Sequence, residues 1–295
     1  MSKTQSVLAV RRRRFHVTPS KVITYVLLSV WAVGTVYPFL WVVQNSFKLK
    51  GQIRSNSFSL PTSATFTLDN YFSGFEKMDV GAAYRNSLII SGTVTVAVII
   101  LGGLAAYGLA RYNFRGRKLL HSLVIAAMMF PVFATIIPVY RLQFGWGIVN
   151  TTVPLSWLSV ILPQTAGNLA FATVILMGFI RSLPIDLEEA AYLEGYGVMR
   201  IFFKIIMPLA RPSFATVGIF AFLWSYNDLF TQDFFLRSKD YFTITLMLNQ
   251  ISSLKGTDYG LMCAAVVMVV IPVLIVYIFL QKNIIKGLTA GAIKG

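Results

Sequence analysis

The stretch from Arg181 to Gly195 reads RSLPIDLEEAAYLEG, and it separates two long apolar runs of the chain. Pro184 disfavours a helical conformation in the residue before it, so the preceding apolar run should end near this point. Asp186 is placed to cap a new helix whose third residue is Glu189, which is a capping-box arrangement with Asp in place of Ser or Thr. Gly195 is a natural helix end. The stretch therefore predicts a short polar helix between two apolar segments.

This predicted helix covers about residues 187–194, and residues 198–207 predict a second one. Apolar side chains recur at helical spacing on one face of the second helix: Val198, Ile201, Phe202 and Ile205. The small side chains of Ala190 and Ala191 would let a partner surface approach closely, and Glu188 could meet its basic groups. An amphipathic hairpin lying on lipid is the alternative, but such a segment usually carries basic residues along its polar face. The acidic residues therefore favour protein docking.

The rest of the chain has the composition of a membrane protein. Of its 295 residues, 56% are hydrophobic and 13% are charged, against about 25% charged in average globular proteins. The net charge is +15, but the basic residues gather at the ends of apolar runs, which favours contact with membrane lipid and disfavours a nucleic-acid partner. The single cysteine, Cys263, and two distant histidines, His16 and His121, indicate neither a disulfide framework nor a metal site.

Six apolar segments without Asp, Glu, Lys or Arg follow one another along the chain, and most approach the ~20 residues of a spanning helix. They cover residues 22–43, 86–110, 122–140, 153–180, 212–226 and 261–280. The fourth is long enough to tilt or to contain a break, and the fifth is short. We expect an all-α polytopic membrane protein. Its parts are a tail at 1–21, a six-helix membrane domain at 22–286 with a loop at 181–211, and a second tail at 287–295.

The positions of the basic residues predict the orientation. The arginine run at 11–14, the basic loop at 111–118, the loop at 181–211 and the C-terminal tail all fall on one side if the chain starts inside. The positive-inside rule then places both termini in the cytoplasm.

The apolar segments also bear on the energy source. Ion-coupled carriers usually need buried ionisable groups, so an ion-coupled secondary carrier is disfavoured, although sodium sites built from carbonyls and hydroxyls keep it open. We find no catalytic residues, and no Gly-x-x-x-x-Gly-Lys-Ser/Thr loop that would hold ATP. Small residues at every fourth position, Gly102, Ala106 and Ala110, predict close helix packing.

The polar loop resembles the coupling signature, or EAA motif, of ABC importer permeases. Glu189-Ala190-Ala191 is followed after three residues by Gly195, and nine residues further on by Ile205-Ile206-Met207-Pro208. Met207 stands where the family usually has Leu. The segment WSYND at 224–228 resembles a Trp-x-Trp-Asn-Asp segment of sugar permeases, and residues 287–295 are similar to the tail of the maltose-type second permease.

This resemblance implies a type I ABC importer permease fold in a bacterial or archaeal inner membrane. It also implies the partners: a second homologous permease, two ATPase subunits that bind ATP and Mg, and an extracytoplasmic sugar-binding protein. This chain itself would hold no cofactor. The cargo would be a sugar, and in the first instance an oligosaccharide, with a non-sugar solute such as a polyamine or peptide as the alternative.

The resemblance further implies residue roles. Coupling to the ATPase falls on Asp186, Glu188, Glu189, Ala190, Ala191, Gly195, Ile205 and Pro208. Contact of the tail with the ATPase falls on Gly291, Lys294 and Gly295. The outer end of the pathway is assigned to Trp224, Tyr226, Asn227 and Asp228, with an ordinary interfacial aromatic belt as an equal alternative for the two aromatics. The loop at 227–260 would reach toward the binding protein. A complete sugar site is not expected in this chain, because the family's site lies mainly in the first permease.

Overall fold

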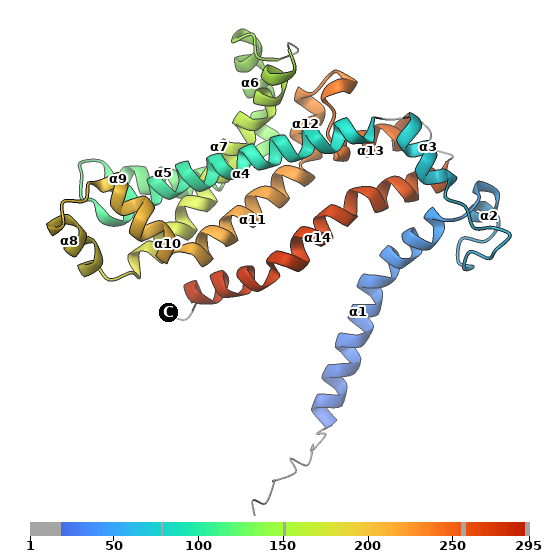
Figure 1. Cartoon of the computed structure of the whole chain (residues 1–295), viewed down its shortest axis with the longest axis horizontal. Coiled ribbons are helices and arrows are strands. Elements are labelled where there is room, and N and C mark those ends of the chain that lie inside the picture. The colour runs from blue at the N-terminus through green and yellow to red at the C-terminus, as the bar shows by residue number, and fades with distance from the viewer. Residues whose placement is uncertain (1–18, 78, 150–151, 255–257, 293–295) are drawn as a thin grey trace, which may run out of the picture.

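Three long helices form the centre of the molecule. They are α4 (Val80–Arg111), α7 (Val153–Arg181) and α11 (Arg211–Asn227), and α4 packs along both of the others (Figure 1). The computed structural model describes residues 19–77, 79–149, 152–254 and 258–292. Every named element within these ranges is a helix, which confirms the expected all-α class for the described residues.

The close packing of α4 depends on two adjacent glycines that face different neighbours. A Cβ atom added at Gly102 would lie 2.9 Å from the Cβ of Ala172 on α7, and one added at Gly103 would lie 2.7 Å from the ring of Phe214 on α11. Both distances are shorter than normal van der Waals contact. Ala106, one turn after Gly102, is fully buried. The ridge of small residues predicted on this helix therefore does serve close helix packing.

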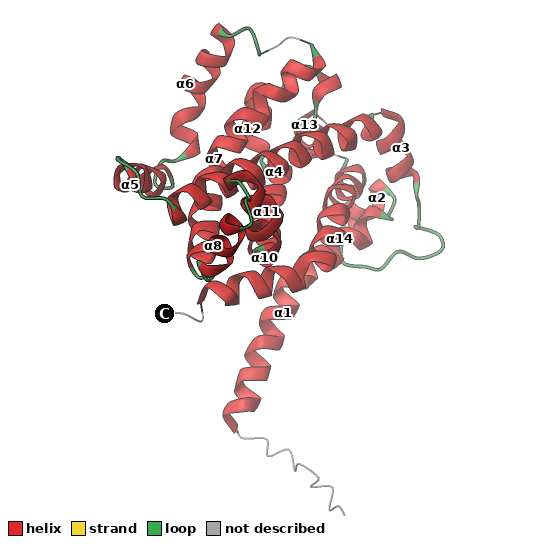
Figure 2. Ribbon diagram, turned by 60° about the vertical axis from the view of Figure 1, so that its left-hand side comes forward, coloured by secondary structure: helices red, strands yellow, loops and turns green. Residues whose placement is uncertain are grey.

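Two further long helices lie outside this centre. The helix α14 (Tyr259–Ala292) packs against α11, and α1 (Pro19–Ser46) contacts α14. Figures 1 and 2 both show α1 extending away from the other helices. None of the apolar window of α1 is buried inside the chain, so its apolar surface is left for lipid or for another protein.

The connection after α1 folds tightly against the end of that helix. It contains α2 (Lys50–Ser55) and α3 (Asp69–Lys77). The side-chain amide of Asn70 donates hydrogen bonds to the carbonyls of Ser46 (2.8 Å) and Lys48 (3.0 Å). These bonds satisfy backbone carbonyls near the end of α1, where no further helical turn can do so.

The third predicted span, residues 122–140, is not one helix. The structure divides it into α5 (Arg117–Ala127) and α6 (Val132–Gly145). The division falls at Pro131, which has an extended backbone conformation. Proline cannot donate a helical hydrogen bond, and it disfavours the helical conformation of Phe130 before it. The expectation of one continuous span there is wrong, because the extended backbone at Pro131 separates α5 from α6.

Four of the other predicted spans correspond to helices long and apolar enough to cross a membrane, namely α1, α4, α7 and α14. The fifth span is α11, which has 17 residues. It meets the same criterion only together with the helical stretch Val198–Leu209 before it, to which it is bent by 86°. The described residues thus contain four or five candidate spans by length and composition, and the number six stays a prediction.

The segment between α11 and α14 packs back onto the end of α4 opposite Arg111. It contains α12 (Leu229–Phe235), the turn η2 (Lys239–Tyr241) and α13 (Ile244–Leu254). The side-chain amide of Asn86 donates to the carbonyls of Asp240 (2.9 Å) and Phe242 (3.0 Å), while the hydroxyl of Ser87 accepts from the backbone N–H of Ile244 (2.9 Å). The described part of this segment therefore covers the end of the bundle, and the expected reach of the loop toward a binding protein stays a prediction.

Candidate coupling site

A compact group of short helices, residues 182–209, lies at the end of the bundle where α4 and α7 finish, and we call it the knob. Its elements are α8 (Asp186–Leu193), α9 (Val198–Ile201), the π-helical segment η1 (Phe202–Ile206) and α10 (Met207–Leu209). Figure 1 shows α8 at the extremity of this end, apart from the long helices. Both short helices predicted from the sequence are present here.

The start of α8 differs from the prediction. The residue before the helix is Ile185, which already has a helical backbone conformation, and the structure shows no side-chain capping bond there. Asp186 is therefore the first helical residue and does not form the predicted capping box with Glu189. The helix begins one residue early because the N–H groups of Glu188 and Glu189 both reach the carbonyl of Ile185 (2.8 and 3.1 Å). The acidic side chains in the first turn still interact favourably with the positive end of the helix dipole.

The end of α8 agrees with the prediction. Gly195 has φ = 83°, a left-handed conformation that costs other residues about 1–2 kcal/mol. Its N–H donates to the carbonyl of Tyr192 (2.9 Å), and the N–H of Tyr196 donates to the carbonyl of Ala191 (3.0 Å). This pair of bonds is a Schellman motif. It turns the chain sharply from α8 into α9.

A buried ion pair joins α8 to the end of α4. The carboxylate of Glu188 lies 2.6 Å from Nε of Arg111, and the two side chains are only 3% and 10% exposed. The hydroxyl of Tyr107, one turn earlier on α4, donates to the same carboxylate (2.8 Å). A further N–H of Arg111 donates to the carbonyl of Leu183 (2.8 Å). Four residues from three segments thus fix α8 relative to α4.

Glu188 therefore differs from the role considered for it from the sequence, because its carboxylate faces Arg111 of the same chain and is not open to a partner. A second contact on this side joins the hydroxyls of Tyr112 and Tyr192 at 2.6 Å. This hydrogen bond raises the pKa of Tyr192. A phenol with the ordinary tyrosine pKa of about 10 is already protonated at neutral pH, so this bond does not depend on the shift.

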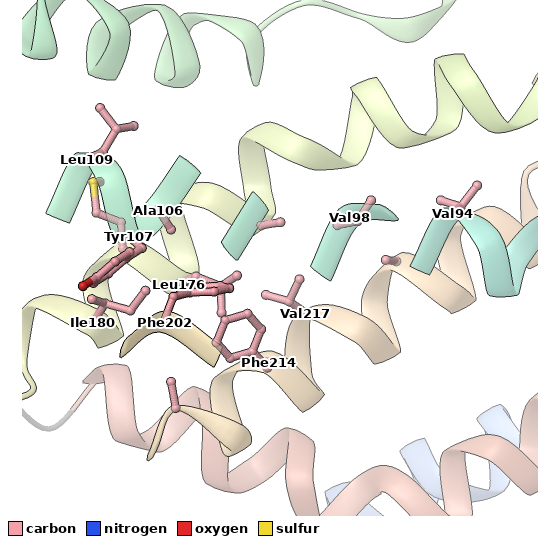
Figure 3. Packing of buried hydrophobic residues seen from close by; sticks show 14 of the residues in the cluster. Val94, Val98, Ala106, Tyr107, Leu109, Leu176, Ile180, Phe202, Phe214 and Val217 are labelled. Atoms are coloured by element: carbon pink, nitrogen blue, oxygen red, sulfur yellow. The ribbon is translucent and has the colours of Figure 1, made fainter. Parts of the chain in front are cut away.

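The second helical stretch of the knob inserts apolar side chains into the centre of the bundle. Phe202 is fully buried, with its ring centroid 5.5 Å from that of Tyr107 on α4 and 6.3 Å from that of Phe214 on α11. Figure 3 shows Phe202 lying between these two rings, with Leu176 and Ile180 of α7 beside it. A displacement of the knob must therefore move side chains that contact all three central helices.

The π-helical segment leads into Pro208. The N–H of Met207 donates to the carbonyl of Phe202, five residues earlier. Pro208 has no N–H to continue the ladder, and the helical axis turns by 86° between Leu209 and Arg211. π-helical turns commonly mark functional sites in helices, and this one joins the knob to α11.

The opposite side of the knob is exposed. Asp186, Glu189 and Ala190 are exposed, and the side chain of Leu193 at the tip is 91% exposed. Ala191, by contrast, is only 4% exposed. It packs inward, whereas the sequence analysis expected it on the surface that a partner approaches. The remaining residues assigned to coupling lie on or under this side: Gly195 and Pro208 are exposed, and Ile205 is half-buried.

The residues assigned to the pathway do not all lie together. Trp224 and Asp228 line one cavity of about 590 Å³, whose wall also includes Phe133 of α6. Tyr226 is 1% exposed and packs instead among residues of α13 and α14, so its assignment to the pathway wall is wrong for this structure. Asn227 is exposed, and its side-chain amide donates to the carbonyl of Leu223 (2.8 Å).

The C-terminal residues are only partly described. Gly291 lies within α14, which continues as a helix to Ala292, while Lys294 and Gly295 lie outside the described residues. The end of α14 is on the same side of the molecule as the knob (Figure 1). Within the described part of the chain, no group of three or more His, Cys, Asp or Glu side chains could hold a metal ion.

Comparison with known proteins identifies the architecture to which the knob belongs. A family model described as "Binding-protein-dependent transport system inner membrane component" matches residues 98–289, a range that contains α7, the knob and α11. The chain belongs to this family. It is a permease subunit of an ABC transporter, a membrane component that transports solute and performs no catalysis.

Relatives of this permease include several transport subunits. The permease is 36% identical to the diacetylchitobiose uptake system permease protein NgcG of Streptomyces coelicolor, over 92% of this chain and 88% of that protein. It is 33% identical to the galactooligosaccharides transport system permease protein GanQ of Bacillus subtilis, over 92% and 95%. It is 32% identical to the melibiose/raffinose/stachyose import permease protein MelC of the same species, over 94% and 98%.

The fold of the permease has been observed before. The structure of a bacterial ABC transporter involved in the import of the acidic polysaccharide alginate contains a chain that matches with a TM-score of 0.76, over 88% of this chain and 95% of that one. The sequence identity is 22%, so this likeness concerns the fold alone. It supports the type I permease arrangement of α4, α7, α11 and α14.

Two residues that contact Glu188, Tyr107 and Arg111, were not assigned to this site from the sequence, where Arg111 was noted only as part of a basic loop. Arg111 ends an apolar run, and that position alone is explained by the positive-inside rule. The spacing Tyr107 to Arg111 was the available signal, because residues four apart share one face of a helix. Only the fold shows that Glu188 faces them.

Proposed function

We propose that this chain is one permease subunit of an ATP-driven importer of sugars, in the first instance oligosaccharides, and that the knob transmits the motion of an ATPase to the pathway. The observation that carries this proposal is the two-sided construction of α8. One side is fixed to α4 by the buried Glu188–Arg111 pair, and the other presents Leu193, 91% exposed, beside acidic and small side chains.

An exposed leucine at the tip of a polar knob is best explained by a partner that covers it. Lipid is a poor candidate, because the acidic residues of α8 would face an anionic membrane surface. A cleft on an ATPase subunit fits better, since it can enclose Leu193 and meet Asp186 and Glu189 with basic groups. We therefore propose the coupling role for the exposed residues of the knob, and a positioning role for the buried ones, Glu188 and Ala191.

The remaining partners follow from this proposal. Two ATPase subunits would bind ATP and Mg, a second homologous permease would complete the pathway, and an extracytoplasmic binding protein would deliver the sugar. Six transmembrane helices with both termini in the cytoplasm would place the knob and the C-terminal residues Gly291, Lys294 and Gly295 on the ATPase side. The coupling loop at 181–211 and the tail at 287–295 would be the two regions of contact.

The geometry gives a direct route for coupling. Closure of the ATPase subunits would displace α8, and the ion pair would carry that displacement to α4. The second helical stretch would carry it through Phe202 to the packing between α4, α7 and α11. Because interdigitated side chains do not deform continuously, such a displacement would favour one of two arrangements of the helices over the other.

The cargo is proposed from the relatives, whose names specify diacetylchitobiose, galactooligosaccharides and melibiose, raffinose or stachyose. Trp224 and Asp228, on the wall of the 590 Å³ cavity, are the two pathway residues that keep their proposed role.

Uptake by the reconstituted complex in proteoliposomes tests the proposal. We expect import of radiolabelled oligosaccharide to require ATP and the binding protein, to stop with vanadate and to persist with an uncoupler. Import that continues under vanadate and collapses with the uncoupler would contradict ATP-driven transport and indicate an ion-coupled carrier. A binding protein that captures only peptides or polyamines would contradict the proposed cargo but leave the coupling intact.

A further inference from the structure

A basic cavity lies beside the knob and takes no part in the coupling described above. It has a volume of about 600 Å³ and lies between the turn that joins α4 to α5 and the end of α7. Its wall includes Arg117 and Lys118 at the start of α5, His121 one turn later, and Arg181 at the end of α7. Residues from two separate helices thus bring three permanent cations and an imidazole to one cavity.

No carboxylate neutralises these cations within the wall of the cavity. The wall of the cavity contains no Asp or Glu. In the ranges that the structure describes, no acidic side chain lies within ion-pair distance of Arg117, Lys118 or Arg181, although such pairs are present elsewhere. Uncompensated positive charge in a concave site attracts anions. The cavity therefore lacks the negative charge that a bound anion would supply.

One of the cations is held in place by the fold. Nε of Arg117 donates to the carbonyl of Leu109 (3.0 Å), and another guanidinium N–H donates to the side-chain oxygen of Asn113. The turn before it contains Gly116 with φ = 91°, which lets the chain reverse from α4 into α5. The guanidinium is thus oriented before any ligand arrives, while Lys118 and Arg181 are exposed and free to close on one.

The surroundings of the cavity indicate which anion it suits. Leu119 in its wall is 64% exposed, and Leu120 and Leu123 further along α5 are 47% and 54% exposed. Cationic and apolar surfaces therefore meet at the point where the apolar helices α4 and α7 end. A free phosphate ion would leave these leucines uncovered, whereas a phospholipid presents a phosphate and acyl chains together.

We propose that this cavity binds the phosphodiester headgroup of an anionic phospholipid, with the acyl chains lying along the exposed leucines of α5. Basic pockets between helices at the membrane surface are suited to such headgroups. The proposal requires that the chain be embedded in a membrane, and it is independent of the cargo and of the ATPase. It assigns a ligand to basic residues that the positive-inside rule would explain only as a marker of the cytoplasmic side.

The test must distinguish specific binding in the cavity from nonspecific attraction by surface charge. An arginine in the same turn provides a matched control. Arg115 is exposed and lies two residues before Arg117, but it does not line the cavity. The double variant carries both Lys118→Gln and Arg181→Gln. We compare the whole transporter complex with this double variant, with Arg115→Gln alone, and with the wild-type chain.

The measurement is native mass spectrometry of the purified complex titrated with phosphatidylglycerol, with phosphatidylcholine as the neutral comparison. We expect phosphatidylglycerol to be retained. The double variant should weaken its binding by about 25-fold, since each of the two lost cations near a membrane surface contributes on the order of fivefold. Arg115→Gln should retain wild-type binding within about threefold.

Three results would overturn the proposal: equal retention of phosphatidylcholine, equal weakening by Arg115→Gln, or displacement of the lipid by millimolar inorganic phosphate, which would make the site one for free phosphate. If the double variant does not assemble, the thermal stability of the wild-type complex decides. It should rise with phosphatidylglycerol and not with phosphatidylcholine or inorganic phosphate, and its failure to do so would also refute the site.

Discussion

Replacement of Glu188 by glutamine should release α8 from the core. The substitution keeps the shape of the side chain and an oxygen that can accept from Tyr107, but it removes the charge opposite Arg111. Removal of one member of a buried ion pair costs about 3–5 kcal/mol, because the remaining charge is left without compensation. Arg111 keeps its hydrogen bond to the carbonyl of Leu183, so we expect the lower end of this range, about 3 kcal/mol.

Hydrogen exchange of the backbone amides of α8 measures this effect locally, since local opening limits their exchange. A loss of about 3 kcal/mol corresponds to exchange that is on the order of 150-fold faster. The matched control is Glu194→Gln, an exposed acid at the end of the same helix, which should change exchange by less than about threefold.

A double replacement gives the second control. Methionine at both Glu188 and Arg111 leaves no buried charge, and such replacements are often neutral or stabilising. Its exchange should therefore be close to the wild-type rate. The reasoning is refuted if Glu188→Gln exchanges like the wild type or like Glu194→Gln, or if the double variant is more labile than the single one.

Three further predictions concern packing, the turn after α8 and coupling. Gly103→Ala should lower the stability of the permease by about 1–3 kcal/mol in thermal unfolding, because the new Cβ meets an aromatic ring of α11. The control Gly108→Ala, at a position with open space, should not lower it. Equal losses of stability in the two variants would contradict the close approach of α4 and α11. Gly195→Ala should lower local stability by about 1 kcal/mol because of the positive φ at this position, whereas Gly197→Ala should lower it less. Hydrogen exchange of the backbone amides in the helix that follows compares the two variants. Ala190→Arg, on the exposed side of α8, should allow normal insertion yet abolish sugar-stimulated ATPase activity of the complex, and wild-type stimulation would argue against docking through this side.

The sequence is most informative where a local rule decides the structure. The Schellman turn at Gly195 follows from the conformational freedom of glycine, and the long apolar helices α1, α4, α7 and α14 follow from composition. The boundary between α5 and α6 could not be fixed in this way, because a proline in an apolar run either kinks a helix or ends it. Neighbouring helices decide between these outcomes.

The direction of each side chain in the knob depended on tertiary contacts. Glu188 and Glu189 are adjacent acids with the same local surroundings in the sequence, yet one is buried and the other exposed. Their difference comes from Arg111, which is 77 residues away from Glu188 in the chain. Tyr226 shows the same limit, since a motif placed it with Trp224 while the rotation of α11 turns the two residues toward different neighbours.

The position of α1 has a consequence for the assembly of the transporter. At 1.5 Å per residue its 28 residues extend about 42 Å, enough to cross a hydrocarbon layer of about 30 Å at a tilt, yet its apolar window gains nothing from burial within this chain. Apart from its contact with α14, the place of this helix in the transporter therefore depends on lipid and on the subunits that assemble around it.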